Sequence, residues 1–138
     1  MKTLALLPLA ALLFSACAST QTELAARTLV QVMEKLYPPP FDELFATVDE
    51  VTDQLGWNVY ARDRTAVYGT ESRIYASIPI APDIPPHQVV LIITPQHDGL
   101  IHVALWHNDQ EHYYNPEPNY VKRFFSLLDR KTKQTPAI

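Results

Sequence analysis

The hydrophobic period of the chain changes at Gly56, and this change limits the folds that are open to it. Before the glycine, one apolar stripe at helical intervals is formed by Phe41, Leu44, Phe45, Val48, Val51 and Leu55. After it, apolar and polar residues alternate with the period of two that half-buried strands show. Glycine often follows a helix end in a left-handed conformation. The pattern therefore predicts a helix over residues 41–55, followed by a block of strands.

Aromatic and β-branched residues continue this strand block to residue 114. They predict strands over 57–62, 66–68 and 73–80, with a turn at 69–72. The clearest hairpin joins 89–94 to 100–106 through a turn ending in Asp98-Gly99, and a further strand is predicted over Glu111 to Tyr114. Residues 79–86 are a loop, because their prolines cannot donate to a strand ladder.

Helices are predicted before and after the strand block in the sequence. Capping-box spacing at 20–23 and helical spacing of the apolar residues after it predict a helix from Thr22 to Tyr37, which the prolines at 38–40 would end. A last helix begins near Tyr120, with basic residues at its negative end. The order of two helices, an antiparallel meander of five or six strands and one helix predicts a single α+β domain over residues 22–134, with a tail at 135–138.

The N-terminus has the proportions of an export signal. Lys2 precedes an apolar stretch from Leu4 to Phe14, which is too short to span a membrane because a spanning helix needs about 20 residues. The stretch ends in Phe14-Ser15-Ala16-Cys17, which resembles the lipobox of bacterial lipoproteins. An ordinary signal peptide, cut after Ala16 or Ala18, is the alternative interpretation.

The resemblance implies a signal peptide over residues 1–16, a diacylglycerol on the sulfur of Cys17 and a short linker over 17–21. An alanine at position 18 is similar to the pattern of lipoproteins sorted to the outer membrane of Gram-negative bacteria, where the domain would face the periplasm. Several acyl chains hold a protein stably on a bilayer, where one does not. Cys17 would then be an attachment point and not a nucleophile or metal ligand.

Charge and motifs argue against several functions. Eleven Lys and Arg residues stand against fifteen Asp and Glu residues, which disfavours a nucleic-acid binder. The sequence has no glycine-rich phosphate loop and no G-x-S-x-G nucleophile motif. We therefore expect a protein that is not an enzyme and needs no cofactor, although an envelope hydrolase is the least favoured alternative.

Two histidines could bind a metal. His107 and His112 flank a predicted turn and could face each other across it, with Asp109 or Glu111 nearby. Imidazole suits both zinc and copper. The alternative is a pair of solvent-exposed histidines at a hairpin tip.

Aromatic and arginine residues in the strand block predict a docking surface for another protein or a glycan, since Tyr, Trp and Arg are enriched at interface hot spots. The candidates are Tyr60, Arg62, Arg64, Arg73, Tyr75, Tyr113 and Tyr114. The alternative is that the aromatic residues build the core.

The favoured function is a protein-binding envelope lipoprotein, either an assembly accessory like the pilotins or an inhibitor like the immunity lipoproteins, by analogy of size and anchoring alone. A small-ligand or metal-binding lipoprotein is the second possibility.

The lipid anchor gives the first testable prediction. Replacing Cys17 by Ser removes the sulfur that would carry the lipid, so Cys17→Ser should abolish lipid labelling and release the protein from membranes. Membrane fractionation after radioactive palmitate labelling measures both effects. Unchanged fractionation of the variant would show that the anchor is not at this residue.

Overall fold

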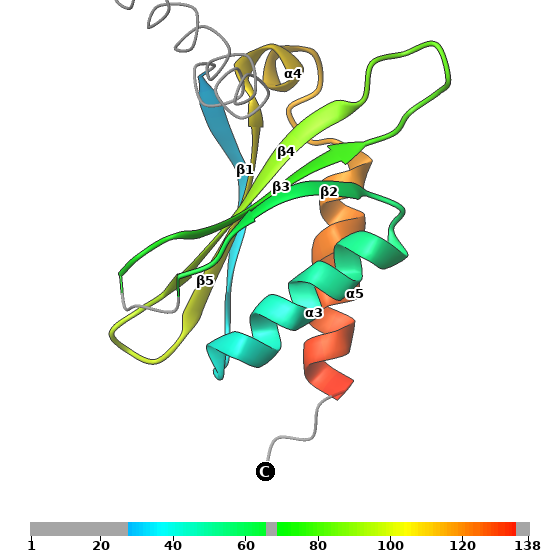
Figure 1. Cartoon of the computed structure of the whole chain (residues 1–138). Helices are drawn as coiled ribbons and strands as arrows, with labels where there is room; N and C mark the ends of the chain where they lie inside the picture. The colour runs from blue at the N-terminus through cyan, green and yellow to red at the C-terminus, as the bar shows by residue number, and fades with distance from the viewer. Residues whose placement is uncertain (1–27, 66–68, 135–138) are drawn as a thin grey trace, which may run out of the picture.

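The computed structural model describes residues 28–65 and 69–134, which form one five-stranded antiparallel sheet and three helices (Figure 1). The strands are β1 (Leu29–Tyr37), β2 (Asn58–Asp63), β3 (Ser72–Ile78), β4 (His87–Pro95) and β5 (Ile101–Asn108). The helices are α3 (Phe41–Gln54), α4 (Asp109–Tyr114) and α5 (Asn119–Gln134). The predicted α+β class is confirmed. No helix in the described ranges has the length and apolar character that a membrane crossing requires.

The sheet is a meander with one added strand. Its order is β1-β5-β4-β3-β2, so consecutive strands from β2 to β5 are neighbours. Strand β1 is added beside β5 and forms one edge of the sheet. Each edge strand carries a bulge: Val32 is the extra residue in β1 and Tyr60 the extra residue in β2. The inner face of the sheet is covered by α3 and α5, which pack against each other at an angle (Figure 1).

Helix α3 matches its prediction closely. Its predicted stripe faces the sheet, with Leu44, Phe45, Val48 and Val51 buried, while Asp42 and Glu43 lie in the first turn, where the helix dipole favours acids. Gly56 follows with a φ of +76°, as predicted, and its N–H donates to the carbonyl of Asp53. The positive φ explains why the helical period stops at this residue.

The predicted central hairpin is also confirmed, with longer strands than the pattern indicated. β4 pairs with β5 from Val89↔His107 to Pro95↔Ile101, and Gly99 turns with a φ of +87°. The proline-rich loop between β3 and β4 holds one isolated bridge, Ala81↔Ile84. The strand predicted at 66–68 lies outside the described residues.

The helix predicted from Thr22 to Tyr37 is wrong for Leu29–Tyr37, which is strand β1; residues 22–27 lie outside the described part of the chain. Leu29, Val32, Met33 and Leu36 have helical spacing, but the bulge at Val32 distributes them over both faces of the sheet. Met33 packs into the inner core, Leu29 packs on the outer face, and Leu36 is 52% exposed. One bulge residue is enough to make a strand imitate the helical period.

The strand predicted over Glu111 to Tyr114 is wrong as well, because these residues belong to helix α4. Asn108 caps this helix: its side-chain oxygen accepts from the N–H of Glu111 at 2.8 Å. Asp109 and Glu111 occupy the first turn, where acids favour a helix start. The local cap therefore overrides the strand preference of the two tyrosines.

The main core lies between the sheet and the two helices. Phe124, Phe125 and Leu128 of α5 are fully buried against Leu91 and Leu105, and the Trp57 ring stacks on Phe124 with centroids 5.5 Å apart. A second, smaller cluster lies on the outer face, where Val90 and Ile92 are buried among Leu29, Tyr75 and Trp106.

Strand β1 is also bound to α5 by polar contacts. The hydroxyl of Tyr37 donates to Asp129 Oδ1, and Lys35 Nζ donates to Asp129 Oδ2, both at 2.7 Å. Burial alone would raise the pKa of Asp129, but these two hydrogen bonds hold it below its usual value. Burial and the same carboxylate raise the pKa of Tyr37.

The centre of the core is predicted to carry much of the stability. Leu91→Ala removes a fully buried side chain from the middle strand, and we expect it to lower the free energy of unfolding by about 2–5 kcal/mol. Ser126→Ala, at an exposed position of α5, should change it by less than about 0.5 kcal/mol. Urea unfolding followed by circular dichroism compares the two, and equal stability would contradict the placement of this core.

Candidate functional site

A cluster of titratable side chains lies at the end of the sheet beneath α4. Four elements contribute to it: His87 begins β4, His107 is the second-last residue of β5, Glu111 and His112 come from α4, and Tyr120 comes from α5. His107 Nε2 and His112 Nδ1 are hydrogen-bonded at 3.0 Å, and the other ring nitrogen of His107 lies 3.2 Å from the Tyr120 hydroxyl. The pair predicted to meet across a turn does meet, across the start of a helix.

Glu111 extends this contact into a network. One carboxylate oxygen lies 2.9 Å from His87 Nδ1. The other accepts from the Tyr120 hydroxyl at 3.4 Å and lies 3.6 Å from His107 Nδ1. The carboxylate thus joins β4, β5 and α5 on the side of His107 that faces away from His112.

Burial determines the charge state of the central histidine. The His107 side chain is fully buried, and this burial lowers its pKa because a buried imidazolium loses its hydration. The Glu111 carboxylate opposes that effect, whereas His112 and His87 add to it. Burial, with Glu111, also raises the pKa of Tyr120, so its hydroxyl stays a proton donor. The network is best described as hydrogen bonds around a neutral His107.

In this arrangement, His107 and His112 could offer a metal ion two imidazole nitrogens as ligands at most. Glu111 contacts Nδ1 of His107, whereas His112 contacts Nε2, so the acid and the second histidine lie on opposite sides of the same ring. Among the described residues, no group of three or more His, Cys, Asp or Glu is arranged to hold a metal ion. A zinc or copper site at His107 and His112 stays a prediction without a third ligand.

The residues predicted to bind a partner fall in three places. Tyr60, Arg73 and Tyr75 lie on the outer face, with the two tyrosine rings 6.2 Å apart. Arg62 and Arg64 turn instead toward α3. Arg62 donates to Asp49 at 2.9 Å, and Arg64 pairs with Asp42 over the ring of Phe45.

The two α4 tyrosines make up the third group. Tyr113 is 82% exposed and Tyr114 is 84% exposed, so neither helps to build the core. Their rings contact each other edge to face at 5.3 Å. The predicted surface is therefore divided between the outer sheet face and the α4 end.

The outer face also contains residues that the sequence interpretation did not select. Across the sheet, Tyr75 pairs with Val90, Val90 with Trp106, and Trp106 with Gln31. The unbroken apolar run 89–93 could have indicated this outer-face cluster in the sequence, because a strand that is apolar at every position is buried on both faces. Buried polar atoms lie here too: within the described chain, Gln88 Oε1 and Trp106 Nε1 have no hydrogen-bond partner.

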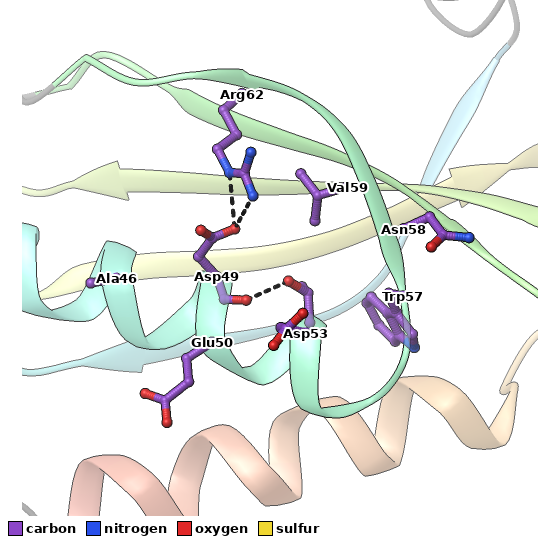
Figure 2. A pocket seen from close by; sticks show the side chains of 9 residues that line it. Ala46, Asp49, Glu50, Asp53, Trp57, Asn58, Val59 and Arg62 are labelled. Carbon is purple, nitrogen blue, oxygen red and sulfur yellow. Dashed lines mark hydrogen bonds and ion pairs between the residues drawn. The ribbon is translucent and has the colours of Figure 1, made fainter.

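A cleft of about 500 Å³ lies between α3 and β2 (Figure 2). Its acids come from one side of α3, namely Asp49, Glu50 and Asp53. The Asp49 carboxylate is held by Arg62. The backbone carbonyl of Asp49 accepts from the Thr52 hydroxyl at 2.6 Å. Glu50 pairs with Lys131 at 2.8 Å. Two of these three carboxylates are thus engaged in ion pairs within the fold.

The buried histidine leads to a prediction about pH. Since the folded-state pKa of His107 is below its unfolded value of about 6.5, the unfolded chain binds an extra proton in acid, and stability is lost as the pH falls below that value. The slope from this one group is at most about 1.4 kcal/mol per pH unit. His107→Gln should remove that part of the slope between about pH 7.5 and 5. His97→Gln, outside the cluster, is the control; an unchanged slope in His107→Gln would assign the pH dependence elsewhere.

Comparison with known proteins finds no relative on which a function could be based. The chain matches no protein-family model, no curated protein and no solved structure. Its functional interpretation therefore depends on the geometry of its own residues.

Proposed function

We propose that this protein is a lipid-anchored protein of the bacterial envelope that binds another envelope protein and catalyses no reaction. The observation that carries the proposal is the outer sheet face, which lies opposite α3 and α5 and has its own apolar cluster (Figure 1). A sheet face that needs no partner is usually polar, because one side of an antiparallel sheet can face water. Apolar residues in the middle of this face favour a protein surface as its partner.

The rim of that cluster has the composition of a binding surface. Tyr75 and Trp106 are partly exposed beside the buried Val90, and Tyr60 is 38% exposed next to Tyr75. Arg73 is partly exposed and paired with Glu71 at 2.9 Å. Aromatic and arginine side chains around an apolar centre resemble the hot spots of protein interfaces.

The edges of the sheet are less suited to binding than its face. A partner could extend the sheet by adding a strand, but β1 and β2 each carry a bulge in the middle of the ladder. A bulge interrupts the regular row of backbone donors and acceptors that strand addition needs. A side-chain interface on the outer face is therefore favoured over backbone pairing at an edge.

A non-enzymatic role is supported by the positions of the described serines. Ser72 is fully buried; its hydroxyl accepts from the N–H of Thr65 at 2.7 Å and donates to the Thr65 carbonyl at 3.0 Å. That hydroxyl has a structural role, since it holds the chain after β2. Ser77 lies within β3 and Ser126 is exposed on α5, both ordinary positions for a serine without a catalytic role.

Site-specific photo-crosslinking in cells tests the docking face. A benzoylphenylalanine replaces Tyr60 or Tyr75 on the outer face, and Ala46 or Ser126, exposed on the helices, in the control variants. We expect one discrete adduct from the two outer-face positions and none from the controls. The identity of the adduct separates an assembly role from inhibition of an enzyme.

The same face can be tested without a crosslinker. Tyr75→Ala truncates a central aromatic side chain, and interface hot spots of this kind typically contribute about 2 kcal/mol or more to binding. We expect the variant to remain folded but to lose at least about tenfold in affinity for the captured partner. Adducts from the control positions alone, or unchanged affinity of a folded Tyr75→Ala protein, would refute the outer face as the interface.

A further inference from the structure

Exposed apolar side chains gather at one end of the sheet. Among the described residues, the large hydrophobic side chains with high exposure are Leu36, Tyr60, Ile80, Ile84, Tyr113 and Tyr114. Four of these six belong to two features at the same end of the sheet: Ile80 and Ile84 to the β3–β4 loop, and the tyrosines to α4. Isolated exposed hydrophobics are ordinary, but a group of them indicates a surface for contact.

The two features share the same end of the molecule. Ile78 pairs with His87 where the β3–β4 loop closes, and His87 Nδ1 lies 2.9 Å from Glu111 of α4. Figure 1 shows α4 and the β3–β4 loop at its upper end, away from the β4–β5 turn. The apolar group is thus a terminal surface and does not belong to the outer face.

The chain also enters the described domain at this end. The N–H of Asp109, the first residue of α4, donates to the Thr28 carbonyl at 2.9 Å, and Leu29 pairs with Asn108. A lipid on Cys17 would be separated from Thr28 by eleven peptide units, which reach about 40 Å when fully extended. The anchor would therefore keep the α4 end within about 40 Å of the bilayer.

We propose that the loop side chains Ile80 and Ile84, with Tyr113 and Tyr114 of α4, insert into the interfacial region of a phospholipid bilayer. This inference rests on the lipid anchor of the proposed function and adds an orientation: the sheet stands with its α4 end on the membrane and its β4–β5 turn directed away. The outer face then stands roughly upright and stays accessible to a partner.

The chemistry of the four side chains fits this region. Tyrosine favours the membrane interface, because its ring is apolar and its hydroxyl stays hydrated. The isoleucines lie on a loop that prolines stiffen, and the N–H of Ile84 donates to the Ala81 carbonyl at 3.2 Å. Stiffening lowers the entropy cost of presenting apolar side chains to the lipid.

The charges at this end favour apolar insertion over electrostatic attraction. Asp83, Asp109 and Glu117 are exposed acids, and Lys122 and Arg123 are exposed cations in the first turns of α5, so both signs of charge are present. Contact with lipid should therefore change little with salt, in contrast to binding by a polybasic segment.

Environment-sensitive labels on the lipidated protein test this orientation. Cys17 is the sole cysteine and its sulfur is blocked by the lipid, so one introduced cysteine gives one labelling site. The full protein carries a nitrobenzoxadiazole (NBD) label at Tyr114→Cys or Ile84→Cys, and at Thr70→Cys at the opposite end as the control. Each variant is reconstituted into phosphatidylethanolamine–phosphatidylglycerol vesicles that contain spin-labelled lipid.

We expect a blue-shifted emission and strong quenching at positions 114 and 84, neither effect at position 70, and the same result in low and high salt. Equal emission and quenching at all three positions, in vesicles that the protein has joined, would overturn the inference.

Failure of the anchor itself would be seen first, because the protein would not float with the vesicles. In that case an N-terminally His-tagged Cys17→Ser chain on nickel-chelating lipids places the same end at the bilayer and keeps one labelling site. Labels at 114 and 84 then test the surface independently of Cys17, with the same two outcomes.

Discussion

The pairing of β1 with β5 is the interaction on which the rest of the structure depends. Ladder contacts from Leu29↔Asn108 to Tyr37↔Ile101 complete the sheet beside its most buried strands. At one end of this ladder the chain reaches α4, where Thr28 bonds to Asp109. At the other end Tyr37, with Lys35, holds Asp129 of α5. One strand therefore closes the sheet, positions the short helix and fixes the long one.

The histidine network shows what a polar group can do in such a fold. His107 occupies a position that an aliphatic side chain could fill, yet its two nitrogens contact α4 and α5. Each contact compensates part of the cost of burying the ring, and together they define how three elements meet. Specific polar contacts of this kind select one arrangement of helices over others that would bury the same apolar area.

Local signals predicted the elements whose pattern is regular. The stripe of α3, Gly56 and the β4–β5 hairpin follow from sequence alone, because neighbouring residues determine them. β1 could not be recognised, since the bulge at Val32 gives Leu29 and Met33 a helical spacing. The contact between His107 and His112 could be predicted, because the two residues are only five positions apart in the sequence. The roles of His87 and Tyr120, and the turning of Arg62 toward α3, depend on tertiary contacts that no local pattern contains.

The bulges in β1 and β2 have a consequence beyond a single molecule. Copies anchored in one bilayer would share an orientation and move in two dimensions, so identical strand edges would collide side by side far more often than in solution. Regular edges would let neighbouring sheets join into a continuous ribbon. Because each edge is interrupted by Val32 or Tyr60, such lateral polymers are disfavoured, and copies anchored on a membrane would stay dispersed.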